Sequence, residues 1–176
     1  MLSGNTVLVT GGAGFIGSHI ADSLVDDNDV YVLDNLTSGD SSNVPDDAEL
    51  IVDDIRNAGA FDGFPDADVI FHEAALVSVP KSVEEPINSH AINVAGTLNV
   101  LEYAREVDAR VVLASSTAVY GEASTLPTPE SESITPSSPY GIDKATIDRY
   151  ARVYHELYGL ETVALRYFNI YGPRQV

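Results

Sequence analysis

The chain has 176 residues, 44% of them hydrophobic, and its 27 acids against 9 bases leave a formal net charge of −18. This length and composition predict a single domain with one sizeable core, and the shortage of lysine and arginine argues against a nucleic-acid partner. Because the chain has no cysteine, disulfides, cysteine-based zinc sites and thiol nucleophiles are excluded, and its four histidines lack the spacing of a metal site.

The acidic excess also bears on the surroundings in which the protein works. Self-repulsion on this scale destabilises a compact state unless counter-ions screen it, so we interpret the composition as an adaptation to high salt. The alternative is that the acids only keep the protein soluble. The sequence has no apolar run long enough for a bilayer and no signal-peptide pattern at its N-terminus, so we expect a cytoplasmic protein without membrane association.

The first predicted element is a buried strand over residues 5–10, NTVLVT, and a helix follows it after the stretch GGAG. The glycines of this strand-to-helix turn fit G-x-G-x-x-G as Gly12, Gly14 and Gly17, and they also fit G-x-x-G-x-x-G counted from Gly11. Such a turn lets the backbone approach a pyrophosphate, while the helix N-terminus supplies N–H groups and partial positive charge. We therefore predict a dinucleotide site; the alternative is a glycine-rich turn without a ligand.

The second predicted strand, DVYVLD at residues 29–34, ends in an acid. Asp34 stands 22 positions after Gly12, near the spacing at which an acid holds the hydroxyls of the adenosine ribose. A carboxylate there would repel a 2′-phosphate, so NAD is predicted in preference to NADP. The alternative is an ordinary solvated aspartate at a strand end.

The rest of the chain alternates between strands and helices. We predict strands at 48–55 and 66–75, a long helix from Pro86 to about Val107, a strand at 109–116, an irregular loop at 121–139, a helix at 139–159 and a last strand within 161–172. This alternation predicts an α/β fold, a Rossmann-type doubly wound parallel sheet, with ligands beyond the carboxyl ends of the strands.

Candidate catalytic residues cluster after the fifth predicted strand. Tyr140 and Lys144 are four positions apart in a predicted helix, so they share one face, and the ammonium favours ionisation of its phenolic neighbour. Ser116 or Thr117, at the end of the strand, is placed to hydrogen-bond a hydroxyl that is being oxidised. Together they predict a proton-transfer site beside a hydride acceptor. The alternative is an amphipathic tyrosine at a helix start next to a polar strand end.

These stretches, together with FHEAA, NVAGTLNVLE, SSTAVYG, YGIDKATID and LRYFNIYGPRQ, resemble the extended short-chain dehydrogenase/reductases, specifically their NAD-dependent sugar-nucleotide epimerase/dehydratase group. The resemblance runs through the whole chain in the right order. It implies that residues 1–176 form an NAD(P)-binding Rossmann domain, the N-terminal part of such an enzyme. It also implies that the smaller C-terminal substrate-binding region is largely absent from this chain.

The resemblance assigns roles to matching residues. It implies a catalytic set, a cofactor-binding set and a substrate-binding set, with no metal. The catalytic set is Ser116, Tyr140 and Lys144; the cofactor set is Gly11, Gly14, Phe15, Ile16, Gly17, Asp34, Asn35, Ser38, Asp53, Ile55, Ala74, Ala75, Leu76, Asn93, Tyr140, Lys144 and Tyr167; the substrate set is Ser116, Thr117, Tyr140 and Asn169, with Phe168 beside them.

The activity that the resemblance implies is 4-epimerisation of a UDP-sugar, the interconversion of UDP-glucose and UDP-galactose, by transient oxidation at C4 with NAD. Related decarboxylases of UDP-glucuronate and dehydratases of dTDP-glucose usually carry an acid just before the VYG element, where this chain has Ala118. The resemblance also implies a homodimer through the two long helices. A non-catalytic NAD-binding fragment is the alternative from another class.

Overall fold

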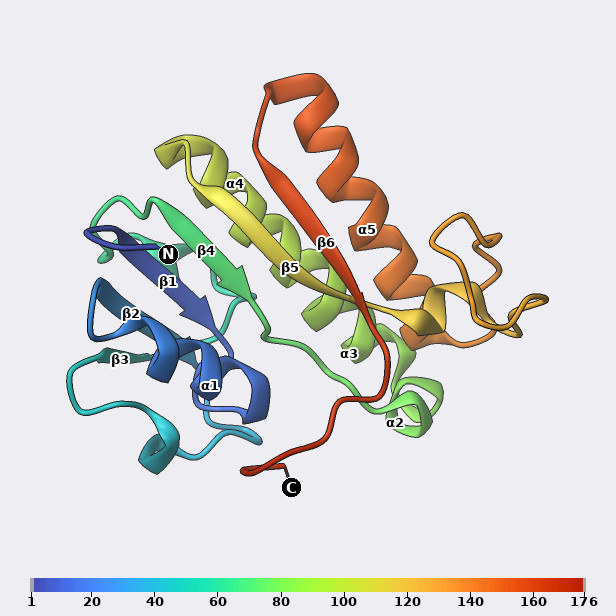
Figure 1. Cartoon of the computed structure of the whole chain (residues 1–176), viewed down its shortest axis with the longest axis horizontal. Coiled ribbons are helices and arrows are strands. Elements are labelled where there is room, and N and C mark those ends of the chain that lie inside the picture. The colour runs from blue at the N-terminus through green and yellow to red at the C-terminus, as the bar shows by residue number, and fades with distance from the viewer. Residues whose placement is uncertain (1, 176) are drawn as a thin grey trace.

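Six strands form one sheet in the computed structural model, which describes residues 2–175 (Figure 1). All neighbouring strands run parallel, in the order β3-β2-β1-β4-β5-β6. The direction of winding reverses between β1 and β4, so the predicted Rossmann-type doubly wound fold is confirmed. The strands are β1 (Thr6–Thr10), β2 (Asp29–Asp34), β3 (Glu49–Val52), β4 (Val69–His72), β5 (Arg110–Ser116) and β6 (Thr162–Tyr167).

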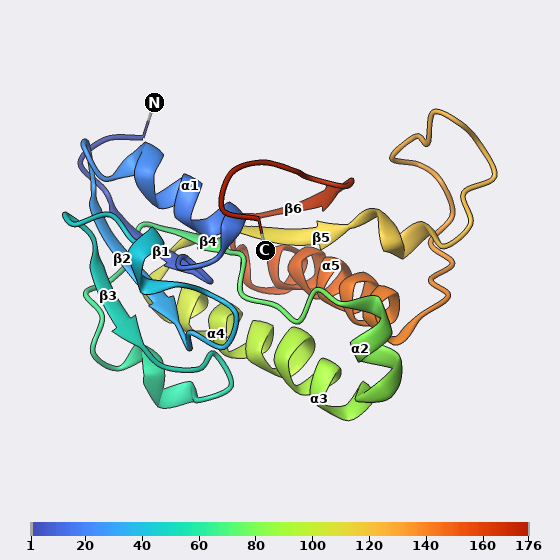
Figure 2. The ribbon, with the colours of Figure 1, turned by 90° about the horizontal axis from the view of Figure 1, so that it is seen from below.

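Helices cover both faces of the sheet. Figure 2 shows α1 on one face and α3, α4 and α5 on the other. The central strands β1, β2 and β4 therefore pack on both faces, which explains the aliphatic runs in their sequences. The helices are α1 (Phe15–Leu24), α2 (Val79–Glu84), α3 (Pro86–His90), α4 (Thr97–Val107) and α5 (Pro139–Tyr158).

Alternate residues of β1 enter two different cores. Val7 and Val9 pack with Ala21 of α1 in the smaller core. Leu8 points to the opposite face and belongs to the larger core. This core also contains Leu101 of α4 and apolar residues of α5. The period of two along a strand thus assigns each side chain of β1 to one layer of the fold.

Several predicted boundaries differ from the observed ones. The strand predicted at 48–55 ends at Val52, and the one predicted at 66–75 covers only Val69–His72. A strand lasts only as long as its neighbours pair with it, and β4 pairs with four residues of β1. The last strand likewise ends at Tyr167.

The predicted long helix from Pro86 is also interrupted. Its middle, Ala91–Gly96, is π-helical, so α3 and α4 are separate α-helical parts of one continuous helical run. A further helix, α2, was not predicted. It has only six residues, too few to show helical periodicity, and only Glu85 separates its end from Pro86.

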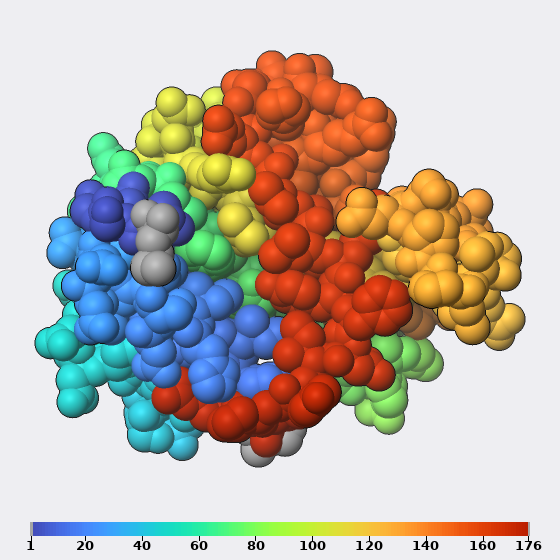
Figure 3. All heavy atoms as spheres, viewed as in Figure 1, coloured from blue at the N-terminus to red at the C-terminus, as the bar shows by residue number. Residues whose placement is uncertain are grey.

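The segment after β6 returns across the molecule to α1 (Figure 3). His19 contacts the carbonyl of Pro173 at 3.1 Å, and Arg174 pairs with Asp22 at 2.6 Å. β6 itself is only partly covered, and Leu165 is 37% exposed. Within residues 2–175, none of the helices combines the length and apolar character needed to cross a membrane.

Candidate active site

The turn between β1 and α1 is packed so closely that Gly11 and Gly17 admit no side chain. A Cβ on Gly11 would lie 2.6 Å from a backbone nitrogen of the segment after β4, and one on Gly17 would collide with the carbonyl oxygen of Gly11. Gly11 also has a φ of +71°, which other residues rarely adopt. Gly14 provides no capping side chain for α1, so the first N–H groups of the helix remain able to bind an anion. Phe15 and Ile16 form the first turn of this helix.

Asp34 ends β2 beside this turn and is buried, with 8% of its surface exposed. Its Oδ2 accepts a hydrogen bond from the N–H of Ala13 at 3.0 Å, and its Oδ1 accepts one from Leu36 at 2.8 Å. Each carboxylate oxygen can accept further bonds, so ribose hydroxyls remain possible partners. Asn35 and Ser38, also predicted at the cofactor, lie exposed in the loop that follows.

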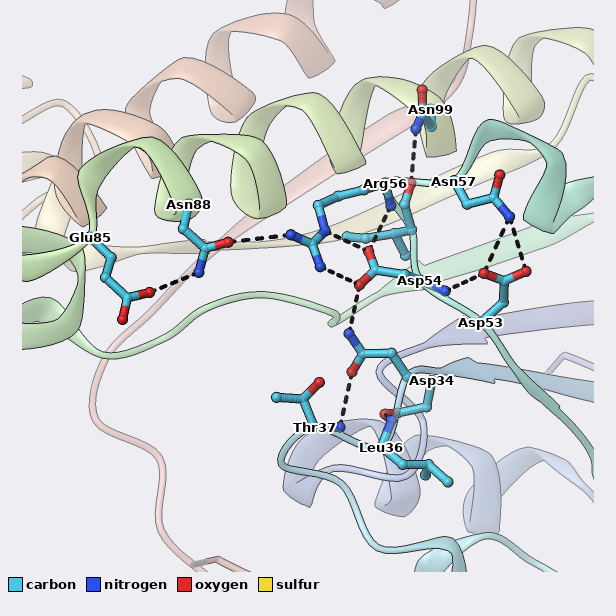
Figure 4. Close-up of polar contacts among 12 residues, drawn as sticks. Asp34, Leu36, Thr37, Asp53, Asp54, Arg56, Asn57, Glu85, Asn88 and Asn99 are labelled. Atoms are coloured by element: carbon cyan, nitrogen blue, oxygen red, sulfur yellow. Dashed lines mark hydrogen bonds and ion pairs between the residues drawn. The ribbon is translucent and has the colours of Figure 1, made fainter.

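The two acids after β3 turn in different directions (Figure 4). Asp53, predicted at the adenine, accepts hydrogen bonds from the side chain of Asn57. Asp54, which was not predicted, accepts from Asn35 at 2.8 Å and from Arg56 at 2.7 Å. The Arg56 guanidinium holds the pKa of the Asp54 carboxyl well below its ordinary value. Asp54 therefore joins the loop after β2 to the loop after β3.

Contacts with the helical run hold the predicted adenine-side residue Ile55 in place. Ile55 is 5% exposed, its carbonyl accepts from Asn99 at 2.9 Å, and a Cβ on Gly96 would lie 2.6 Å from its side chain. The next residue, Arg56, donates to Asn88 of α3 at 3.3 Å (Figure 4). This end of β3 is thus tied to both α3 and α4.

Asn93 holds the segment that leaves β4. Its Oδ1 accepts from the N–H of Leu76 at 2.8 Å, and its Nδ2 donates to the Leu76 carbonyl at 3.1 Å. Asn93 lies in the π-helical stretch, where the Thr97 hydroxyl donates to its carbonyl at 2.6 Å. Such stretches are frequent at functional sites. The predicted residues Ala74 and Ala75 are half-buried along the same segment, against the glycine turn.

Ser116, Tyr140 and Lys144 meet at the carboxyl end of β5. Ser116 lies close enough to Tyr140 to influence its pKa, and the Ser116 Oγ accepts a hydrogen bond from the N–H of Ala118 at 3.1 Å. Lys144 Nζ donates to the carbonyl of Ala114 at 2.7 Å and lies 5.8 Å from the centre of the Tyr140 ring. The structure therefore brings the three predicted catalytic side chains into one site.

Burial opposes the charged forms of both Tyr140 and Lys144. It raises the pKa of Tyr140, and the nearby Ser116 hydroxyl offsets part of that rise. Burial also lowers the pKa of Lys144 to about 8, against the opposing influence of Glu73 and Asp143. Lys144 is therefore mainly protonated at neutral pH, and a cation stands beside a phenol whose ionisation burial resists.

Two further titratable groups at the end of β4 were not predicted: His72, which is buried, and Glu73, which is partly buried. Glu73 Oε1 accepts a hydrogen bond from the Tyr167 hydroxyl at 3.2 Å, and burial raises the pKa of Glu73 to about 7. His72 lies between the hydroxyls of Thr10, at 2.6 Å, and Thr97, at 2.8 Å, and burial lowers its pKa to about 3. Both belong to the FHEAA stretch. A histidine and an acid at the carboxyl end of a predicted strand are the pattern that could have indicated these two residues as part of the site.

The predicted substrate residues lie farther apart than the three predicted catalytic residues. Thr117 opens a short 3₁₀ turn, Thr117–Tyr120, that Ser116 caps. Phe168 is 64% exposed and Asn169 is exposed after β6, and over residues 2–175 no hydrogen bond joins Asn169 to Ser116 or Tyr140. The same residues contain no group of three or more histidines and acids arranged to hold a metal ion.

Comparison with known families gives a match over almost the whole chain. The NAD dependent epimerase/dehydratase family matches residues 7–176. A relative from Methanocaldococcus jannaschii, assigned provisionally as a UDP-glucose 4-epimerase, is 48% identical over 96% of this chain and 57% of its own length. This chain therefore spans little more than half the length of that relative.

Solved structures agree closely with this fold. The UDP-N-acetylglucosamine 4-epimerase of Methanobrevibacter ruminantium M1, in complex with UDP-N-acetylmuramic acid, is 43% identical with a TM-score of 0.95, over 99% of this chain and 58% of its own. The UDP-glucose 4-epimerase of Thermus thermophilus in complex with NAD is 41% identical with a TM-score of 0.87, over 97% of this chain and 57% of its own.

Proposed function

The chain belongs to the NAD-dependent epimerase/dehydratase family, and from that premise we propose that it carries the cofactor site and the catalytic residues of a UDP-sugar 4-epimerase. The observation that carries this proposal is the meeting of Ser116, Tyr140 and Lys144 at the carboxyl end of β5. They share the sheet edge with the glycine turn after β1, where a doubly wound sheet binds its ligands.

The residues present fit NAD. A cradle in which a Cβ on Gly11 or Gly17 would collide with backbone suits a pyrophosphate in close contact with the main chain. Asp34 would hold the ribose hydroxyls, and its charge favours NAD over NADP. The residues proposed at the adenine are Asp53 and Ile55, with Asp54 added because it contacts Asn35. Tyr167 is proposed at the nicotinamide. When bound, NAD accepts a hydride from C4 of the sugar and returns it.

In the proposed mechanism Tyr140 acts as the base for the sugar 4-hydroxyl. Burial makes the phenol a weak acid, so its ionisation depends on the nearby Ser116 hydroxyl and on the Lys144 ammonium. Ser116 donates to the 4-hydroxyl oxygen and holds it in line with Tyr140. After the 4-keto sugar turns over within the site, Tyr140 returns the proton to the C4 oxygen. Because the hydride would be restored to C4 from the opposite face, the configuration inverts with no net redox change.

Ala118 favours epimerisation over the related eliminations. It stands just before Val119 and Tyr120, and its N–H is bonded to Ser116. A dehydratase or decarboxylase recruits an additional acid at this point, and a methyl group offers none. We therefore propose the UDP-glucose and UDP-galactose pair as substrates, with UDP-glucuronate decarboxylase and dTDP-glucose dehydratase as the activities that Ala118 disfavours.

We further propose that residues 1–176 act as one NAD(P)-binding domain and that the protein is a homodimer. The outer surface of α5 and the turn before it form a shallow groove lined by Pro136, Ile142, Tyr150 and Val153. Ile142 is 52% exposed, and Ile87 on neighbouring α3 is 85% exposed. These apolar side chains suit pairing with the same helices of a second copy. Light scattering in concentrated potassium chloride tests this, and a monomer would refute it.

The function itself is tested by a coupled assay that offers UDP-galactose and UDP-N-acetylgalactosamine separately, with NAD binding measured by calorimetry. Epimerisation of either sugar supports the proposed reaction, and preference between them decides the substrate. NAD binding without turnover on any UDP-sugar would instead support a non-catalytic cofactor-binding module.

A further inference from the structure

Glu73 lies where the parts of the catalytic site come together. β4 and β5 are paired so that His72 is opposite Leu113, which puts Glu73 beside Ala114 at the next position. The carbonyl of Ala114 is the acceptor for the Lys144 ammonium. Glu73 is therefore next to the strand position that holds Lys144.

The Glu73 side chain also crosses the end of β5. Tyr167 belongs to β6, on the far side of β5, where it is paired with Ser116. The Tyr167 hydroxyl donates to Glu73 Oε1 at 3.2 Å. One carboxyl thus links β4 to β6 above the strand end that carries Ser116.

The charged surroundings of Lys144 single out Glu73. The titratable groups that face Lys144 are Tyr140 and Asp143 from α5, and His72 and Glu73 from the end of β4. Asp143 already accepts from Ser89 at 2.6 Å and contacts His90 at 3.0 Å. Burial keeps His72 neutral at neutral pH.

We propose that Glu73 is a positioning residue of the reaction, whose carboxylate keeps the buried Lys144 ammonium charged beside Tyr140 and whose hydrogen bond orients Tyr167. This rests on the proposed function, which gives Tyr140 and Lys144 their roles. A buried ammonium loses hydration, and a nearby anion offsets that loss. Without Glu73, Lys144 would release its proton at a lower pH and Tyr140 would lose its cationic neighbour.

Lysine labelling gives a direct test, because the chain contains only Lys81 and Lys144. In protein labelled with ¹³C and ¹⁵N lysine, the exposed Lys81 serves as an internal reference while Lys144 is titrated by NMR. Glu73→Gln removes the charge and keeps an oxygen for the Tyr167 hydroxyl. It should move the Lys144 midpoint down by about one pH unit and leave Lys81 unchanged. The matched variant Tyr167→Phe breaks the hydrogen bond, keeps the charge and should leave the Lys144 midpoint in place.

The parent chain provides a test that needs no variant. As Glu73 loses its proton near pH 7, the Lys144 signal should show a small step before its own titration. Absence of this step, an unchanged midpoint in Glu73→Gln, or an equal change in Tyr167→Phe would each overturn the proposal.

Turnover separates this proposal from the proposed function. In an active enzyme, Glu73→Gln should lower kcat and move the high-pH fall of kcat to lower pH, with KM for the UDP-sugar retained. A lower kcat with an unchanged pH profile would mean a structural role and overturn the proposal. If the parent enzyme turns over no UDP-sugar, the proposed function fails and the reaction role of Glu73 fails with it, while the NMR titration still reports whether Glu73 controls the charge of Lys144.

Discussion

Residues 1–68, which contain β1 to β3, and residues 69–176, which contain β4 to β6, act on ligands by different means. In the first half the candidate groups are backbone N–H groups of a turn that excludes any Cβ, and the Asp34 carboxylate held by backbone donors. In the second half they are buried or partly buried side chains whose pKa values burial displaces, upward for Tyr140 and Glu73 and downward for Lys144. The candidate site in the first half therefore depends on close packing of the backbone. The candidate site in the second half depends on side chains that are shielded from water.

The two halves also differ in charge. The first contains fourteen acids and one base, Arg56, whereas the second contains thirteen acids and eight bases. A strongly negative surface around the adenosine side suits a cofactor without a 2′-phosphate. In the second half one base pairs with a partly buried acid, where Arg166 lies 2.8 Å from Asp148. The comparison predicts that substitutions in each half disturb different properties.

The largest effect should come from Tyr140→Phe, and it should fall on turnover alone. The phenylalanine keeps the ring packed but removes the oxygen that takes the proton, so turnover should fall by about 10²–10⁴-fold. NAD affinity by calorimetry and thermal unfolding should stay unchanged. Tyr171→Phe is the matched control, since Tyr171 is 89% exposed, and it should alter none of the three. Near-normal turnover in Tyr140→Phe would contradict the role of Tyr140 as the catalytic base, and with it the catalytic role proposed for the second half.

Gly17→Ala should disturb the first half and leave the chemistry of the second intact. Its new methyl group would collide with the backbone of the glycine turn, so the free energy of unfolding should fall by roughly 1–3 kcal/mol and NAD affinity should weaken. Gly63→Ala is the control, because a Cβ there would meet nothing within 4 Å. Equal melting temperatures and NAD affinities for the two variants would contradict the close packing of the turn.

Asp34→Asn should change selectivity between cofactors more than affinity for either. Removing the charge should narrow the preference for NAD over NADP by about tenfold, or roughly 1.4 kcal/mol. Asp47→Asn, in an exposed loop of the same half, makes the same change in net charge and should leave the ratio unchanged. Calorimetric titration with both cofactors gives the ratio. A parent chain that binds NAD and NADP equally would refute the role assigned to Asp34.

Added salt should change stability least for each residue, and it should stabilise the two halves of the chain unequally. Screening relieves repulsion between acids, so the melting temperature should rise between low and multimolar potassium chloride. Amide hydrogen exchange should show this gain concentrated in residues 1–68, at roughly tenths of a kcal/mol for each amide. A melting temperature that stays flat would reject the adaptation to high salt. A uniform gain would reject the contrast between the halves.

Local features were predictable from the order of residues. The spacing of Gly11, Gly14 and Gly17 after an aliphatic run indicated the strand-to-helix turn, and β2 ends at Asp34 as predicted. The four-residue spacing of Tyr140 and Lys144 put both on one face of α5 because helical geometry alone does so. In each case the cause lies within a few neighbours along the chain.

Other features depend on residues far apart in the sequence. Asp54, and not Asp53, contacts the loop after β2. Its partner there, Asn35, lies nineteen positions earlier in the chain. Gly96, in the π-helical stretch, meets the side chain of Ile55 from another segment, forty-one positions earlier. No local pattern carries these contacts, so the sequence could not indicate them.

By itself the sequence determined the order of strands and helices, the glycine turn, and the residue types offered at the carboxyl ends of the strands. Only the tertiary structure decided which of those side chains lose water. His72, Glu73, Tyr140 and Lys144 have displaced pKa values because β4, β5 and α5 pack around them. Burial is a property of the assembled layers. The affinity of a side chain for a proton depends on how much solvent surrounds that side chain, and not on its position in the sequence.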